Sequence, residues 1–219
     1  MNSELQKRTV TSVFLLSLLT LMYFYNFILI ISSIIIALVC WIEFYSLISK
    51  VFRKKNIKNK ILIFIYKVVS LLYLCGVVFL IIYIKTLNTD LLIILVFSLL
   101  VAIMSDIGGI IFGRFFKGKK LTKISPNKTI SGSIGSFIFS LILIPLFIDY
   151  FNNHNFLIMI LFTVIISLTS QLGDLLISFF KRRAKVKNTS DLLPGHGGVL
   201  DRVDGIIFAI PVGLLIFNI

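Results

Sequence analysis

The chain has 219 residues, of which 58% are hydrophobic and only 14% charged, and its net charge is +13. Soluble domains contain roughly 45–50% apolar and about 25% charged residues, so this composition excludes an ordinary soluble domain and predicts an integral membrane protein. In a soluble protein the positive charge would indicate a nucleic-acid partner, but basic residues orient membrane proteins, so we expect no nucleic acid.

The apolar segments predict an all-α polytopic transmembrane helical bundle, because a spanning helix needs roughly 20 apolar residues. About seven segments meet or approach this length. In chain order they cover residues 9–25, 27–48, 61–84, 91–113, 132–149, 156–179 and 198–218. Only Tyr25 and Asn26 separate the first two, which predicts a tight hairpin. The first run is longer than a signal-peptide core, so we expect it to be retained.

The basic residues predict the orientation of these spans. Of the 22 Lys and Arg residues, two lie near the N-terminus, six in 49–60, six in 114–128 and five in 181–197. With seven spans these segments share one side, which predicts an N-in/C-out topology. The abundance of Ile, Lys, Asn and Phe is typical of an AT-rich genome. We therefore expect a multi-pass protein of a bacterial cytoplasmic (inner) membrane.

Five of the nine acidic residues fall inside or at the edge of the predicted spans. Charged groups there cost roughly 2.5–3.5 kcal/mol at the bilayer centre and usually have a function. The five are Glu43, Asp106, Asp174, Asp201 and Asp204. All lie toward the cytoplasmic ends of their spans, which predicts a site at the cytoplasmic side; the alternative is that each acid neutralises a neighbouring Lys or Arg. Asp174, Ser178 and Lys181 share one helix face because they are spaced i, i+4 and i+7.

The segment 178–204 combines these acids with several cations and a glycine-rich turn around His196. Cations and the backbone amides of such a turn suit phosphates, whereas carboxylates need a metal ion before they can approach one. Oxygen ligands without a usable Cys or His set favour Mg²⁺ over Zn²⁺. We expect His196 to position a phosphate, with a purely structural role as the alternative. Cys40 and Cys75 fall in apolar spans and are expected to have no chemical role.

A second polar motif covers residues 105–135. A helix carrying Asp106 is followed by a basic loop, then by a turn at Ser125 and Pro126 and a new helix. Most of the loop cations are explained by membrane orientation. Arg114 and Lys128 adjoin the spans, so we expect them to contact phosphates.

These two motifs resemble phosphatidate cytidylyltransferases, also called CDP-diacylglycerol synthases. Within the family signature the matching residues are Ser178, Lys181, Arg182, Lys187, Ser190, Pro194, His196, Gly197, Gly198, Asp201, Arg202 and Asp204. Trp41 and Glu43 resemble an early Trp-Glu pair of the family. The chain departs from the family at Asn188, Ile110 and Ser131, where Asp, Tyr and Glu are usual.

The resemblance implies transfer of the cytidylyl group of CTP to phosphatidate, giving CDP-diacylglycerol and pyrophosphate for phospholipid synthesis. It implies catalytic roles for Asp174, Ser178, Lys181, Asp201 and Asp204, of which Asp174 and Asp201 would bind the metal. The expected substrate-binding residues are Arg114, Lys128, Arg182, Lys187, His196, Gly197, Gly198 and Arg202. The expected cofactor is Mg²⁺, with a monovalent cation as a further candidate, and a homodimer is a candidate assembly. The chain is expected to form a single integral-membrane domain over residues 1–219, with N-terminal helices at 1–90 and catalytic helices and loops at 91–219.

Three alternatives remain open at this point. A related CTP-dependent polyprenol or phytol kinase would use the same carboxylate and metal chemistry. A divergent, weakened paralogue or scaffold would explain the departures from the signature. An anion transporter or channel would place charges at the midplane or on both sides, which the one-sided charge pattern disfavours.

Overall fold

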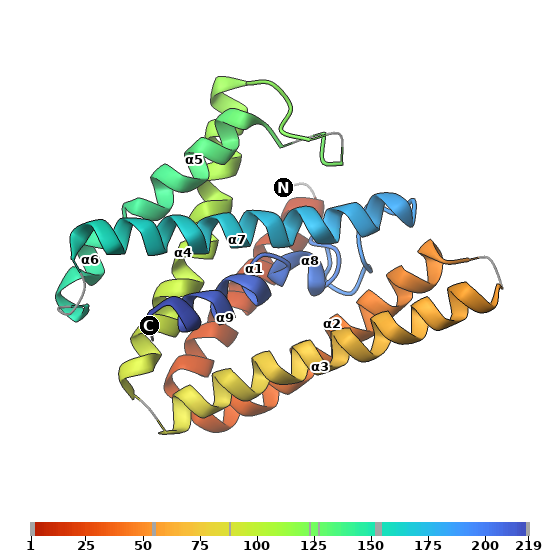
Figure 1. The fold of residues 1–219 in the computed structure, drawn as a ribbon, viewed down its shortest axis with the longest axis horizontal. Coiled ribbons are helices and arrows are strands. Elements are labelled where there is room, and N and C mark those ends of the chain that lie inside the picture. Colours follow the sequence, from red (N-terminus) through yellow and green to blue (C-terminus); the bar gives the residue numbers. More distant parts are fainter. Residues whose placement is uncertain are drawn as a thin grey trace. The chain divides into compact units, whose positions relative to one another are not determined.

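The computed structural model describes residues 3–53, 56–87, 89–122, 124–126, 128–151 and 155–217. Within these residues the chain forms helices and two isolated backbone bridges, which confirms the predicted all-α class. The elements are α1 (Ser3–Phe24), α2 (Asn26–Val51), α3 (Ile57–Leu87), α4 (Thr89–Phe116), α5 (Ile130–Leu141), α6 (Ile144–Phe147), the 3₁₀ helix η1 (Ile148–Tyr150), α7 (Phe156–Arg183), α8 (Leu200–Val203) and α9 (Ile206–Phe217) (Figure 1). Among the basic-loop residues, Lys54, Lys55 and Lys123 lie outside the described ranges.

Five helical segments of the described chain are long and apolar enough to cross a membrane. They are Asn26–Val51, Ile57–Thr86, Leu91–Phe116, Ile130–Tyr150 and Phe156–Arg183. The expected segments 9–25 and 198–218 are not among these five. The second of them is interrupted by a turn at Asp204 and Gly205, which leaves α9 with 12 residues. At 1.5 Å per residue such a helix is about 18 Å long, shorter than a hydrocarbon core of about 30 Å.

The chain divides into two compact units that interleave along the sequence. The first comprises Met1–Leu87 and Phe180–Val203, and the second comprises Asn88–Phe179 and Asp204–Ile219. The predicted division near residue 90 therefore coincides with the first boundary, but residues 180–203 return to the first unit. Helix α7 runs through the boundary at residue 180.

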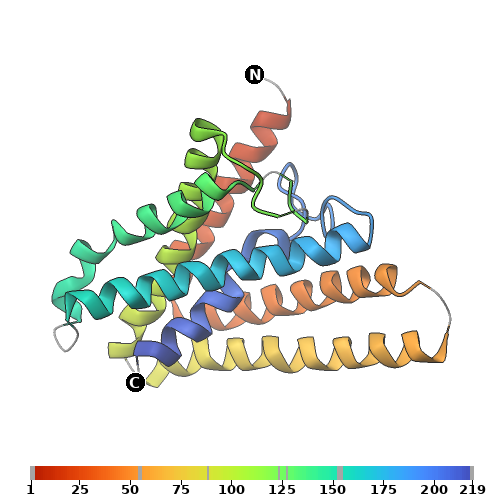
Figure 2. The same cartoon turned by 45° about the horizontal axis from the view of Figure 1, so that its top comes forward.

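In the first unit, α2 and α3 lie side by side along most of their length (Figures 1 and 2). Only Tyr25 lies between the end of α1 and the start of α2, and the two helices contact each other, as the predicted hairpin requires. At the start of the returning segment, Phe180 packs edge-on against Phe44 of α2 and Tyr66 of α3, with ring centroids 5.5 and 5.8 Å apart. These contacts bring residues 180–203 against α2, where α8 also packs.

In the second unit, α4 and α5 approach closely through glycines. A Cβ atom at Gly108 would overlap the carbonyl oxygen of Gly135, and one at Gly132 would lie 2.8 Å from the carbonyl oxygen of Gly109. Small residues allow helix backbones in membranes to come this near. Thr129 caps α5 by accepting a hydrogen bond from the Gly132 N–H at 3.0 Å.

Candidate functional site

The glycine-rich turn of the first unit has a conformation that requires its glycines. Gly195 and Gly197 have φ values of 74° and 85°, a region that residues with a Cβ atom rarely adopt. The N–H groups of His196 and Gly197 donate to the carbonyl oxygen of Leu193 at 2.9 and 3.1 Å. These two amides therefore close the turn itself instead of pointing at a ligand.

Gly198 has a different role, which is to permit close packing. Its N–H donates to Oδ2 of Asp201 at 3.0 Å. A Cβ atom at this position would overlap Oγ1 of Thr189 and would lie 2.5 Å from Oε2 of Glu43. Only glycine fits between these oxygens, which meet around the residue that the sequence analysis assigned to substrate binding.

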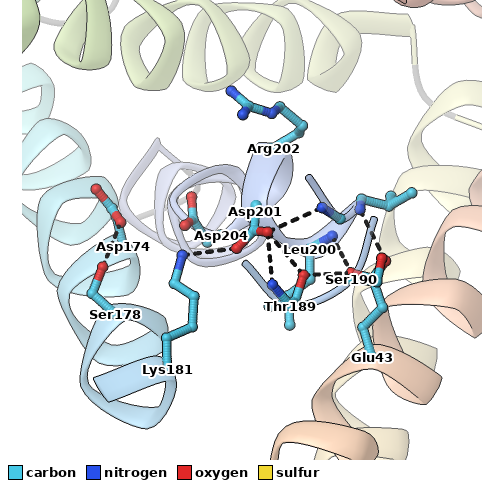
Figure 3. Close-up of polar contacts among 12 residues, drawn as sticks. Glu43, Asp174, Ser178, Lys181, Thr189, Ser190, Leu200, Asp201, Arg202 and Asp204 are labelled. Atoms are coloured by element: carbon cyan, nitrogen blue, oxygen red, sulfur yellow. Dashed lines mark hydrogen bonds and ion pairs between the residues drawn. The ribbon is translucent and has the colours of Figure 1, made fainter. Parts of the chain in front are cut away.

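Asp201 is the centre of a polar cluster formed by residues 181–201 (Figure 3). Its Oδ1 accepts from Nζ of Lys181 at 2.8 Å, and its Oδ2 accepts from the N–H and the Oγ1 hydroxyl of Thr189 at 2.9 and 3.1 Å. The side chain is 8% exposed. Burial alone would raise the pKa of this carboxyl, but the hydrogen bonds from Lys181, Thr189 and Gly198 and the charge of Lys181 bring the pKa below its ordinary value. Asp201 is therefore ionised at neutral pH.

Glu43 was counted among the span acids but was given no catalytic or binding role, and the structure places it in this cluster. It is 4% exposed on α2 and accepts four hydrogen bonds from the returning segment (Figure 3). The donors are the hydroxyls of Thr189 and Ser190, at 2.9 and 2.5 Å, and the N–H groups of Val199 and Leu200, at 3.1 and 2.8 Å. The acid inside an apolar helix was a visible signal, but nothing near it in sequence indicated these distant partners.

Helix α1 and Arg202 also hold the turn. Oγ1 of Thr11 donates to the carbonyl oxygen of Pro194 at 3.0 Å, and Oγ of Ser12 lies 3.4 Å from Nε2 of His196. Nε of Arg202 donates to the carbonyl oxygen of His196 at 3.0 Å. The guanidinium that was expected to bind substrate thus also supports the backbone of the turn.

In the second unit, Asp174 lies on α7 beside a cation. Its Oδ1 accepts from Oγ of Ser178 at 3.2 Å, which confirms the predicted shared helix face of these two residues. Its Oδ2 forms an ion pair with Nζ of Lys128, whose side chain is 27% exposed against 24% for Asp174. Lys128 was expected to contact phosphate, and here it neutralises a carboxylate.

The remaining predicted residues differ in how far they are exposed. Arg114, Arg182 and Lys187 are exposed, whereas Asp204 is buried in the turn before α9. Asp174 and Asp201, the predicted metal ligands, belong to different compact units. Among residues that the structure describes, no group of three or more His, Cys, Asp or Glu side chains gathers as a metal site.

One departure from the family signature has a local structural use. Oγ of Ser131 accepts from the N–H of Gly118 at 3.2 Å and lies 3.1 Å from Oγ1 of Thr129, the residue that caps α5. The serine therefore ties the basic loop to the start of this helix. Ile110 is exposed on α4, and nothing in the structure explains its presence in place of tyrosine.

Comparisons with known proteins agree with the motifs. A family profile described as the cytidylyltransferase family matches residues 1–219. Curated relatives include a phosphatidate cytidylyltransferase of Staphylococcus haemolyticus (strain JCSC1435), which is 46% identical over 123 residues, and one of Staphylococcus aureus (strain COL), which is 45% identical over 121 residues. Each alignment covers 54% of this chain and 46% of the relative, so the matched region corresponds to about half of the relative's length.

Proposed function

Because this chain belongs to the cytidylyltransferase family, we propose that it transfers the cytidylyl group of CTP to phosphatidate, forming CDP-diacylglycerol and releasing pyrophosphate. The observation that carries this proposal is the profile match over residues 1–219. The polar clusters around Asp174 and Asp201 support it, because they combine carboxylates with cations in the way that phosphate chemistry requires.

The proposed reaction needs no nucleophilic side chain. A phosphate oxygen of phosphatidate is anionic near neutral pH and attacks the α-phosphorus of CTP. A new P–O bond forms, and the bond from the α-phosphorus to the oxygen that bridges to the β-phosphate breaks, so pyrophosphate leaves with the electron pair. The protein has to hold two anions together and screen their repulsion. Lys128, Arg182 and Lys187 are the side chains that we assign to this task.

Asp174 and Asp201 are the residues proposed to hold Mg²⁺. Their carboxylates fit a hard cation, since each already forms an ion pair with an ammonium group. Asp174 pairs with Lys128 and Asp201 pairs with Lys181, and Asp201 is ionised. Bound Mg²⁺ would neutralise charge on the phosphate oxygens of CTP. We also propose a monovalent cation as a further ligand of this region, and the contribution of the protein is to orient both carboxylates.

The test uses full-length protein purified in detergent and two labelled forms of CTP. With phosphatidate as acceptor, a cytidylyltransferase transfers label from [α-³²P]CTP to the lipid and none from [γ-³²P]CTP. A polyprenol or phytol kinase gives the opposite pattern with its own acceptor. Label from [α-³²P]CTP in the lipid fraction, abolished by EDTA, is the expected result, and its absence from folded protein that binds CTP would overturn the proposal.

Two variants connect the activity to the site. Asp174→Asn keeps the shape of the side chain and removes its charge, so we expect activity to fall by about 100-fold or more, as when a metal ligand is lost. Asp191→Asn is the matched control, because Asp191 is an exposed acid of the basic segment 181–197 that follows α7. Equal loss in both variants would contradict a specific role for Asp174.

We further propose that the basic segments face the cytoplasm and that the chain crosses a bacterial cytoplasmic membrane seven times, with an N-in/C-out orientation. The one-sided distribution of Lys and Arg supports this orientation. Single-cysteine variants in 49–60 and 181–197, labelled in intact cells and in inverted vesicles, test it.

The homodimer suggested by the resemblance is tested by light scattering of the purified protein.

A further inference from the structure

We propose that Glu43 is a positioning residue of the site, which holds the segment 189–200 in place and orients the Asp201 carboxylate through Thr189. Glu43 is not a catalytic residue in this proposal, because it acts on the site through other protein groups. The inference deepens the proposed function and depends on it only for its activity measurement.

Glu43 is surrounded by hydrogen-bond donors. Four hydrogen bonds from Thr189, Ser190, Val199 and Leu200 converge on a side chain that is 4% exposed. A buried carboxylate is costly unless its lone pairs are satisfied, and it can accept about four hydrogen bonds. The four donors therefore match its capacity. Removing the carboxylate leaves the Ser190 hydroxyl and two backbone N–H groups without this acceptor, and it leaves Asp201 as the remaining acceptor of the Thr189 hydroxyl.

The donors to Glu43 lie on both sides of the glycine-rich turn. Thr189 and Ser190 precede the turn, whereas Val199 and Leu200 follow it, and Leu200 begins α8. One side chain from α2 thus joins the two ends of the turn (Figure 3). The turn positions His196 and leads directly into Asp201. The hydrogen bonds of Glu43 to both ends of the turn therefore help to fix the positions of both residues.

The Thr189 hydroxyl lies between Glu43 and Asp201. Oγ1 of Thr189 lies 2.9 Å from Oε2 of Glu43 and 3.1 Å from Oδ2 of Asp201. A hydroxyl carries one proton, so Thr189 donates to one carboxylate at a time, while its Oγ1 lies within hydrogen-bond distance of both. The groups that hold a ligating side chain are commonly worth about 10- to 100-fold in metal affinity or activity. We assign that role to Glu43 and Thr189 toward Asp201.

The experiment compares Glu43→Gln, Thr189→Val and Thr189→Ser with the wild-type protein. Glutamine keeps the shape of Glu43 but replaces one carboxylate oxygen with an NH₂ group, which cannot accept hydrogen bonds from the surrounding donors. Valine keeps the shape of Thr189 without its hydroxyl, and serine restores the hydroxyl. Leu47→Ala is the packing control, since Leu47 is 1% exposed one turn further along α2.

Hydrogen–deuterium exchange of the apo protein in detergent is the readout that needs no activity. In Glu43→Gln we expect faster exchange in peptides covering 189–203, with peptides of α4 and α5 unchanged. Unchanged exchange in 189–203, or the same acceleration in Leu47→Ala, would overturn the proposal. Because this readout uses neither CTP nor phosphatidate, it still decides the inference if the wild-type protein forms no CDP-diacylglycerol.

The second readout is the Mg²⁺ concentration that gives half-maximal activity. We expect it to rise by about 10- to 100-fold in Glu43→Gln and by about tenfold in Thr189→Val. The KM for phosphatidate should change less than about twofold, because neither side chain is assigned to the lipid. Thr189→Ser should recover most of the Mg²⁺ response. An Mg²⁺ requirement that stays at the wild-type value in Thr189→Val would overturn the link to Asp201.

Discussion

Nζ of Lys181 donates to Oδ1 of Asp201 at 2.8 Å, and the two side chains are only 13% and 8% exposed. Removing one partner of such a pair leaves an uncompensated charge in a poorly solvated place, at a cost of about 3 kcal/mol. We therefore expect Lys181→Met to lower the thermal stability of the detergent-purified protein and to abolish its activity. Thermal denaturation followed by tryptophan fluorescence and CDP-diacylglycerol formation measure the two effects.

The double variant Lys181→Met/Asp201→Asn separates the structural role of this pair from its chemical role. Replacing both partners removes the isolated charge, so stability should return toward the wild-type value while activity stays lost. A double variant that is as unstable as the sum of the single variants would show that the two side chains are not coupled.

Lys128 should compete with a divalent cation for Asp174. Its ammonium group forms an ion pair with Oδ2 of Asp174, and both side chains are about one-quarter exposed. Pairs of this exposure contribute about 0.2–1 kcal/mol, equivalent to a factor of about 1.4 to 5. We expect Lys128→Gln to lower the Mg²⁺ concentration for half-maximal activity by this factor and to raise the KM for CTP. A higher Mg²⁺ requirement would contradict the competition.

Gly198→Ala should disrupt the site although it adds a single methyl group. The new Cβ atom would overlap Thr189 and would lie 2.5 and 2.8 Å from the two carboxylate oxygens of Glu43. We expect a loss of activity of about 100-fold, together with faster proteolysis at the basic residues of 181–187. The control is Gly76→Ala on α3, where a Cβ atom would have no neighbour within 4 Å. Similar activity losses in both variants would contradict this explanation.

The depressed pKa of Asp201 predicts how stability changes with pH. A carboxyl whose pKa is lower in the folded state stabilises the fold above its unfolded-state pKa of about 3.9, and this contribution disappears as the pH falls through the folded-state value. The stability difference between the wild-type protein and Asp201→Asn should therefore be constant above about pH 5 and should shrink below about pH 4. Denaturation temperatures of both proteins from pH 3 to pH 8 measure it. A difference that grows on acidification would contradict the ionised state.

Local spacing was sufficient to predict some features of the fold and the site. The i, i+4 interval between Asp174 and Ser178 places both on one face of α7, where the structure shows a hydrogen bond. Ser125 and Pro126 indicated a turn before α5, and the helix begins at Ile130 after the Thr129 cap. Such features depend on residues within one or two turns of each other, so the sequence alone contains the necessary information.

Features that depend on distant residues could not be predicted in this way. The partners of Glu43 lie 146 to 157 positions later in the chain, and no local pattern relates them. The glycine-rich sequence predicts backbone amides that suit phosphate, but those of His196 and Gly197 close the turn on Leu193. The continuous apolar character of 198–218 also concealed the turn at Asp204 and Gly205, because average hydropathy does not report on a local break in a helix.

The distance along the chain between Glu43 and its partners has a consequence for biosynthesis. The ribosome completes α2 long before it adds Thr189 to Leu200, which lie 146 to 157 residues further on. Until then the Glu43 carboxylate belongs to an apolar helix without its four donors, at a cost on the order of 2.5–3.5 kcal/mol if the helix has entered the bilayer. A nascent chain that stops before residue 189 therefore keeps an unsatisfied acid in its second helix, and final docking of α2 becomes one of the last steps of membrane assembly.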